Sequence, residues 1–171
     1  DVSIEETNYI LELQQSEEIA AACAHIPNLK FPKYYEKLSS DRIITMDYMH
    51  GEHLSEYVSH STDEIQANKI GQALWDFFMY QIHTLRKVHA DPHPGNFLIS
   101  KEGDLIALDF GCMKSIPDEF YKPYFELAKK ENISDPEIFA SKLYELEILR
   151  EDDSDFEKDF FTKMFHDMLS L

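Results

Sequence analysis

Glycine and cysteine are both scarce in this chain of 171 residues, which contains five glycines and two cysteines. So few glycines disfavour an all-β fold, whose tight turns depend on them, and favour helices. The two cysteines, Cys23 and Cys112, show no metal-ligand spacing, and a lone pair does not indicate a disulfide framework. We therefore expect a helix-rich chain from a reducing compartment.

Basic residues are also few, because 16 Lys and Arg stand against 33 Asp and Glu and the net charge is −17. An acidic surface repels phosphate backbones, so nucleic acid is not an expected partner. Many of the acids fall between residues 145 and 159, and we expect this stretch to be a solvated face and loop.

Long apolar runs are missing, since none approaches the roughly 18–20 residues of a membrane-spanning helix. The N-terminal run Asp1–Glu6 is polar and acidic, unlike a secretory signal. We expect no membrane span in this chain and a cytoplasmic location.

Hydrophobic residues make up 43% of the chain and aromatic residues 13%, which is enough for one domain with a core or for part of a larger one. In the helix expected over 63–87, apolar residues recur at helical spacing, and Ser61 and Glu64 are its predicted cap. The other expected helices are 3–24, 54–58, 118–131, 135–149 and 156–169, and the expected strands are 31–35, 42–48, 97–99 and 105–108. The fold class is α+β and mostly helical.

The most informative segment is the loop from His89 to Asn96, followed by the Asp-Phe-Gly sequence at 109–111. Asp91 and Asn96 lie five residues apart, and Asp109 follows after two short apolar strands. This is the spacing of a kinase catalytic loop and its metal-binding turn. The hairpin turn 101–104 between the strands would fix the separation of Asn96 from Asp109.

Phosphoryl transfer requires charge neutralisation and positioning more than covalent chemistry. Asp91 would orient the acceptor hydroxyl or a water molecule and take up its proton. Asn96, through its amide oxygen, and Asp109, through its carboxylate, would bind Mg²⁺, which prefers oxygen ligands. His89 is expected to have a structural role, with its ring bonded to backbone beneath the loop.

A transition-metal site is a different interpretation of the same loop. His89, Asp91 and His93 alternate as on a strand, and Asp109 could be a further ligand. Pro92 and Pro94 would disrupt such a strand, however, and the spacing of Asn96 from Asp109 would then be a coincidence.

The run His-Ala-Asp-Pro-His-Pro-Gly-Asn-Phe-Leu-Ile at 89–99, followed by Leu-Asp-Phe-Gly-Cys-Met at 108–113, closely resembles the UbiB (AarF) family of atypical kinases. Residues 1–8 resemble the family's Asp-x-x-x-Glu-Ala-x-Asn signature on helix C of the kinase fold, although Glu6 replaces the usual Ala. The resemblance implies that Glu5 pairs with the nucleotide-binding lysine. At 45–51 it implies a hinge, where Met46 is the gatekeeper and the Asp47 carbonyl and Met49 amide meet the adenine edge.

The resemblance further implies a protein-kinase-like fold, with an N-lobe remnant at 1–46, a hinge at 47–53 and a C-lobe at 54–171. It implies Mg²⁺-dependent binding of ATP or ADP, phosphoryl transfer or ATP hydrolysis, and a link to isoprenoid-quinone or other lipid metabolism. A lipid or quinone precursor would then be a partner, and the parent protein would associate with the inner membrane from its periphery.

The family's Lys-x-Gly-Gln extension, its Ala-rich nucleotide loop and its strand lysine all precede helix C, and none is found in this chain. Each preorganised charge contact can supply roughly 3–4 kcal/mol of transition-state stabilisation, so we expect these 171 residues alone to be inactive or very feeble. Two alternatives share the scaffold: a pseudokinase-type binding module and a small-molecule phosphotransferase of the aminoglycoside type.

Overall fold

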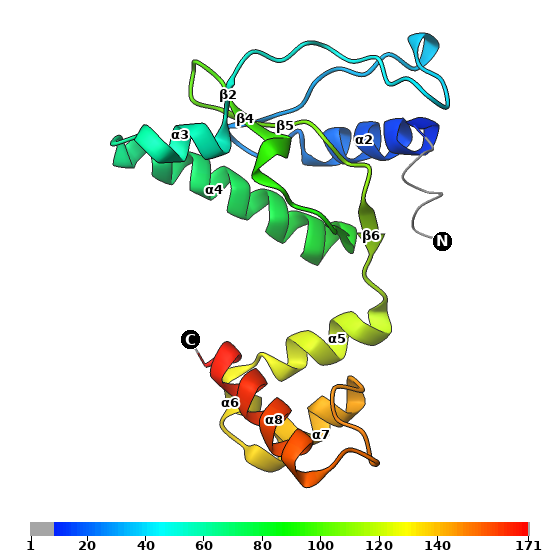
Figure 1. The fold of residues 1–171 in the computed structure, drawn as a ribbon, viewed down its shortest axis with the longest axis vertical. Helices are drawn as coiled ribbons and strands as arrows, with labels where there is room; N and C mark the ends of the chain where they lie inside the picture. Colours follow the sequence, from blue (N-terminus) through cyan, green and yellow to red (C-terminus); the bar gives the residue numbers. More distant parts are fainter. Residues whose placement is uncertain (1–8, 171) are drawn as a thin grey trace. The chain divides into compact units, whose positions relative to one another are not determined.

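A computed structural model describes residues 9–170, which group into two compact units. Unit 1 ends at Ser115 and unit 2 begins at Ile116. The described part of unit 1 contains six strands, three α-helices and three short turns of other helix types (Figure 1). Its helical elements are α2 (Tyr9–Cys23), η1 (Glu36–Leu38), α3 (Leu54–His60), α4 (Glu64–Tyr80), η2 (Gln81–Leu85) and η3 (Pro94–Asn96).

Unit 1 has a four-stranded sheet in the order β1-β5-β4-β2 and a separate pair, β3 with β6. The strands are β1 (Leu29–Lys30), β2 (Glu52–His53), β3 (Lys87–His89), β4 (Phe97–Ile99), β5 (Leu105–Ala107) and β6 (Met113–Ser115). β4 and β5 form the predicted hairpin, in which Phe97 lies opposite Ala107. All residues of both strands are buried, so burial on both faces fixes the register of this hairpin.

The strands predicted at 31–35 and 42–48 were wrong as continuous strands. The two segments do run antiparallel, because Tyr35 N–H donates to Thr45 O and Asp47 N–H to Lys33 O, each at 2.9 Å. However, only single bridges form, such as the one between Tyr34 and Met46. Pro32 has no N–H to donate, and a pair of strands without further partners is marginal.

The helix predicted over 63–87 is confirmed in its position but differs at both ends. Its N-cap is Asp63, whose carboxylate accepts from Gln66 N–H at 3.0 Å. Ser61 is instead the C-cap of α3, where its N–H donates to Tyr57 O. At the other end, α4 passes into the π-helical turn η2, and Arg86 then has a left-handed backbone with φ of 54°. This turn ends the helix so that β3 can begin at Lys87.

The core of unit 1 joins α2, β1, α4 and the hairpin. At its centre the Phe77 ring lies 5.8 Å from Phe31 and 6.2 Å from Phe110. The aromatic stripe of α4 is therefore core, as predicted. Phe110 belongs to the Asp-Phe-Gly segment, so the core directly anchors the turn that carries Asp109.

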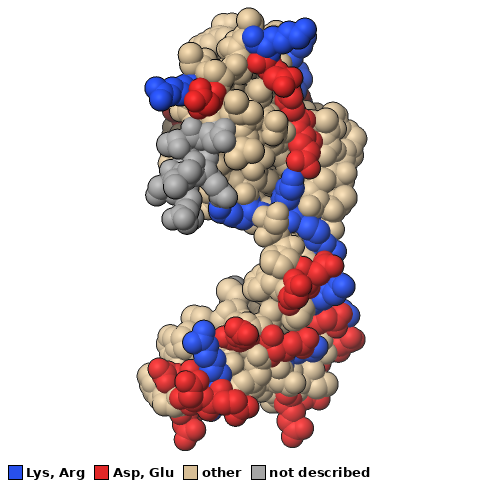
Figure 2. Space-filling model, turned by 90° about the vertical axis from the view of Figure 1, so that its right-hand side faces the viewer, with Lys and Arg blue, Asp and Glu red and all other residues tan. Residues whose placement is uncertain are grey.

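Unit 2 is helical, with its own small core of Leu127, Phe139, Leu143 and Leu149. Its helices are α5 (Asp118–Leu127), α6 (Lys130–Ile133), α7 (Pro136–Glu145) and α8 (Asp155–Leu169). The helix predicted over 118–131 is interrupted because Lys129 is extended. The acids between 145 and 159 are exposed, apart from the half-buried Asp153, which confirms the predicted solvated face. Figure 2 shows acidic side chains dense on unit 2.

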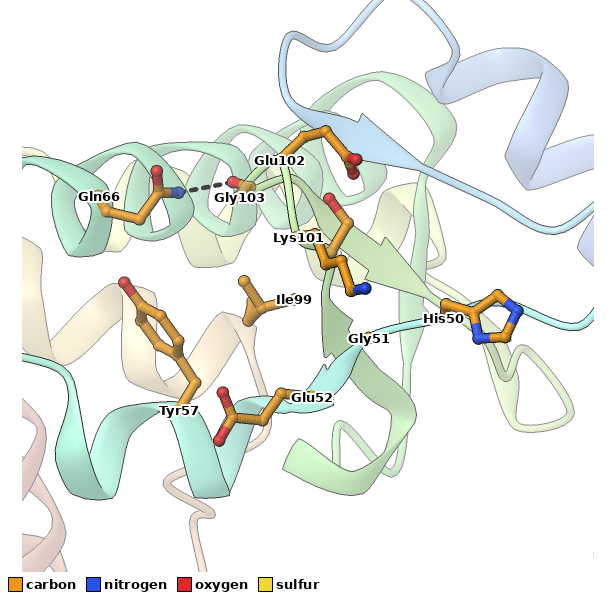
Figure 3. A pocket seen from close by; sticks show the side chains of 10 residues that line it. His50, Gly51, Glu52, Tyr57, Gln66, Ile99, Lys101, Glu102 and Gly103 are labelled. Atoms are coloured by element: carbon orange, nitrogen blue, oxygen red, sulfur yellow. Dashed lines mark hydrogen bonds between the residues drawn. The ribbon is translucent and has the colours of Figure 1, made fainter.

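The turn between β4 and β5 is tied to its surroundings by one carboxylate. Asp104, whose side chain is 13% exposed, contacts Lys30 Nζ at 2.7 Å and Lys69 Nζ at 3.3 Å. Gln66 Nε2 donates to Gly103 O at 2.6 Å, drawn as a dashed line in Figure 3. The hydrogen bond from Lys30 is the main cause that lowers the pKa of Asp104, and Lys69 adds to it.

We predict that Asp104→Asn lowers the free energy of unfolding by about 1–2 kcal/mol near neutral pH, since both lysine partners are partly exposed. Because the pKa of Asp104 is lowered in the folded state, its contribution is present above the ordinary Asp value of about 3.9 and is lost as the pH falls through the lowered value. Urea unfolding at a series of pH values checks this. A difference from wild type that persists in strong acid would contradict it, and the exposed Asp41→Asn is the control.

Candidate active site

The catalytic-loop segment begins where β3 ends, at His89. This residue is 6% exposed, and its side chain bonds to two backbone groups. Asp91 N–H donates to His89 Nδ1 at 3.1 Å, so the ring proton is on Nε2, which donates to Asp109 O at 3.0 Å. One imidazole thus holds the backbone of Asp91 to that of Asp109. The predicted structural role of His89 is confirmed.

The hairpin places Asn96 beside Asp109. Leu108 N–H donates to Asn96 O at 3.0 Å, which continues the β4–β5 pairing by one step. Asn96 therefore lies opposite the residue that immediately precedes Asp109. The hairpin fixes their separation, as the sequence predicted.

Asp109 itself is exposed, whereas the next residue, Phe110, is 1% exposed. Its Oδ1 accepts from Gly111 N–H at 2.8 Å, which closes a local turn. The buried phenylalanine and this turn together hold the carboxylate at the surface of the core. Its second oxygen has no hydrogen-bond partner among the residues that the structure describes.

Asp91 and Asp109 face one cavity of about 470 Å³. Its lining consists of Tyr9, Glu12, Ile44, His89, Asp91, Asp109, Gly111 and Cys112. Three of these residues carry carboxylates, and none of the lining residues that the structure describes is Lys or Arg. Two of the predicted site residues are thus brought together in one hollow, with oxygen atoms as its principal polar groups.

Sequence reasoning did not identify Glu12 as a site residue. It comes from α2, and burial followed by the charge of Asp109 raises its pKa. A signal was present in the sequence, since Glu12 follows Glu5 by seven residues, two helical turns, and so would lie on the same helix face. Glu5 itself lies outside the described residues.

The predicted hinge residues do not line this cavity. Met46 is 42% exposed, and the Asp47 carboxylate accepts from Tyr35 Oη at 2.7 Å. Within residues 9–170, no hydrogen bond engages the Asp47 carbonyl or the Met49 amide. Asn96 is half-buried and is not part of the lining of this cavity.

The donor atoms at this site fit Mg²⁺ better than a transition metal. Asp109 supplies a carboxylate oxygen and Asn96 an amide oxygen, which are hard ligands. Both ring nitrogens of His89 are engaged, and His93 Nδ1 accepts from Gly95 N–H at 3.0 Å. In the described part of the chain, no three His, Cys, Asp or Glu side chains could hold a metal among themselves. The alternative site built on His89 and His93 is therefore not supported.

A second cavity in unit 1, also about 470 Å³, lies between the turn 101–103, β2, α3 and α4. In Figure 3, Tyr57 and Glu52 lie on one side of it and the turn that carries Lys101 lies on the other. None of the predicted site residues within 9–170 lines it.

Comparison with known proteins identifies the family of this chain. Residues 2–138 match the family described as the ABC1 atypical kinase-like domain. The chain belongs to this family. It is 28% identical over 127 residues to AarF domain-containing protein kinase 1 of Mus musculus and 28% identical over 154 residues to that of Xenopus laevis. These matches cover 71% and 82% of this chain.

The chain spans 24% and 30% of the lengths of these two relatives. Among solved structures, the erythromycin complex of Rv3197 from Mycobacterium tuberculosis is similar, with a TM-score of 0.75 and 19% identity. That match covers 98% of this chain and 42% of the other. The kinase-like fold and the UbiB (AarF) resemblance are thus confirmed. No helix within residues 9–170 is both long and apolar enough to cross a membrane.

Proposed function

We propose that the natural protein carrying this chain is a UbiB-type atypical kinase or ATPase that binds ATP with Mg²⁺ and transfers or hydrolyses its terminal phosphate. The observation that carries the proposal is the convergence of Asp91 and Asp109 on one cavity, with their backbones joined through His89. Named kinases among the relatives support the general class.

Asp91 is the proposed catalytic base. Its carboxylate orients the acceptor, a hydroxyl group or water, and takes up the proton while the acceptor oxygen forms a bond to the terminal phosphorus. The bond from that phosphorus to the bridging oxygen breaks, and ADP leaves with the electron pair.

Asn96 and Asp109 are the proposed metal ligands, through an amide oxygen and a carboxylate oxygen. Bound Mg²⁺ would neutralise charge on the phosphates. The register of the hairpin, in which Phe97 lies opposite Ala107, supports this pairing because it holds the backbones of the two residues at a fixed separation.

The remaining predicted residues complete the proposal. The Asp47 carbonyl and Met49 amide, which have no partner within residues 9–170, are available to the adenine edge beside Met46. Glu5 pairs with a nucleotide-binding lysine. The N-lobe and C-lobe are joined by the hinge at 47–53. The phosphate acceptor is a molecule of lipid or quinone metabolism. Cytoplasmic location, at the periphery of a membrane, is part of the same proposal.

Isothermal titration of the natural protein with ADP, with Mg²⁺ and then with EDTA, tests this function. We expect binding that depends on Mg²⁺ and slow turnover of ATP. Absence of MgADP binding would overturn the proposal. Binding without any turnover would instead favour a pseudokinase-type module.

A further inference from the structure

Glu12 lies in the active-site cavity in an unusual environment. The carboxylate is half-buried, yet within residues 9–170 it has neither a hydrogen bond nor an ion pair. The ionisable groups around the cavity are Tyr9, His89, Asp91, Asp109 and Cys112. The described lining residues include no Lys or Arg, and both ring nitrogens of His89 are engaged with backbone groups, so none of these residues pairs with the Glu12 carboxylate.

The carboxylate of Glu12 lies close to Gly111, in the turn that carries Asp109. A Cβ atom placed on Gly111 would lie 3.1 Å from Glu12 Oε2 and 3.4 Å from Asp109 Oδ1. The two carboxylates therefore border the same small volume. The glycine leaves this volume open, because any side chain at 111 would press against Glu12.

The Tyr34 hydroxyl does not donate a hydrogen bond to either carboxylate. The hydroxyl of Tyr34, close to both carboxylates, donates instead to Leu108 O at 3.3 Å. The pKa of Tyr34 is raised to about 12, mainly by burial and also by the charges of Glu12 and Asp109. A hydrogen bond with Ser16 acts in the opposite direction. By contrast, Asp104 in the same unit is paired with two lysines. An unpaired carboxylate beside another is unfavourable and is typical of a functional site.

We propose that Glu12 supplies a second carboxylate to the cation that Asp109 holds, so that α2 takes part directly in metal binding. Mg²⁺ is commonly bound through one or two protein carboxylates, with waters and phosphates as its other ligands. The inference rests on the proposed function, because it concerns the same cation. With Glu12 as a ligand, the affinity for the cation depends on the position of α2.

A purely structural role for Glu12 makes a different prediction. A structural role would mean that the charge or the packing of Glu12 on α2 stabilises the folded protein without metal. If this were its role, Glu12→Gln would lower the stability of the metal-free protein and leave metal affinity unchanged. If Glu12 is a ligand, the substitution removes repulsion from Asp109 and stabilises the metal-free protein.

The test is a titration with Mn²⁺, used as a spectroscopic substitute for Mg²⁺, on the natural protein in the presence of ADP. Electron paramagnetic resonance measures the bound Mn²⁺. Glu12→Gln should weaken Mn²⁺ binding about tenfold. It should also raise the midpoint of thermal unfolding without metal. Glu17→Gln, an exposed position on the same helix, should change neither quantity.

Mn²⁺ affinity of Glu12→Gln equal to that of Glu17→Gln would overturn the inference. A fall in both affinity and metal-free stability would overturn it too, because that result indicates a structural role. Asp109→Asn separates the two proposals. If Asp109→Asn leaves Mn²⁺ binding intact, the proposed function fails; if it removes binding while Glu12→Gln does not weaken it, only the role of Glu12 fails.

Discussion

Replacing Asp109 by Asn is expected to weaken MgADP binding about 100-fold, because the substitution removes the charged oxygen ligand of the cation. The change should leave the fold intact. The amide oxygen of the new side chain can still accept the Gly111 N–H that now bonds to Asp109 Oδ1, and Phe110 remains buried in the core. Isothermal titration with MgADP measures the loss.

Two controls accompany this variant. Its affinity for ADP in EDTA should not fall, since that binding does not depend on the metal. Its free energy of unfolding should be at least that of wild type, because the substitution also removes the repulsion between Asp109 and Glu12. Unchanged MgADP affinity would place the metal elsewhere and contradict the assignment of Asp109.

Replacing Asp91 by Asn should lower kcat for ATP turnover about 10²–10⁴-fold, because an amide cannot take up the proton of the acceptor. MgADP affinity should stay within about twofold of wild type, since the proposed contact of Asp91 is with the acceptor and not with the nucleotide. The Asp91 N–H that donates to His89 is retained, so the loop should keep its conformation. Steady-state kinetics and titration on the same preparation measure both quantities.

A matched comparison is available in the same loop. His93→Ala removes an exposed side chain that bonds only to Gly95 N–H within the described residues, and it should affect turnover far less. If Asp91→Asn turned over ATP as fast as wild type, another group would have to be the base.

The central part of the site could be predicted from sequence because its geometry is local. Asp91, Asn96 and Asp109 are separated by one loop and one hairpin, and the buried strands β4 and β5 allow a single register. The structural role of His89 followed from the same local pattern. Each of these predictions needed no knowledge of how distant segments pack.

The predictions that failed depend on tertiary context. The segments 31–35 and 42–48 have strand-like composition but pair only at isolated bridges. Asp63 and not Ser61 is the cap of α4, because this helix begins at Glu64, while Ser61 is still the C-cap of the preceding helix. Glu12 was missed for the same reason, since its approach to Gly111 depends on the packing of α2 against the turn.

The most direct test of the metal site is a crystal structure of the natural protein with ADP and Mn²⁺, in which anomalous scattering locates the metal. We expect a Mn²⁺ ion about 2.1 Å from a carboxylate oxygen of Asp109, with the amide oxygen of Asn96 and the phosphates of ADP among its other ligands. A Mn²⁺ ion that binds the phosphates but contacts neither Asp109 nor Asn96 would contradict it.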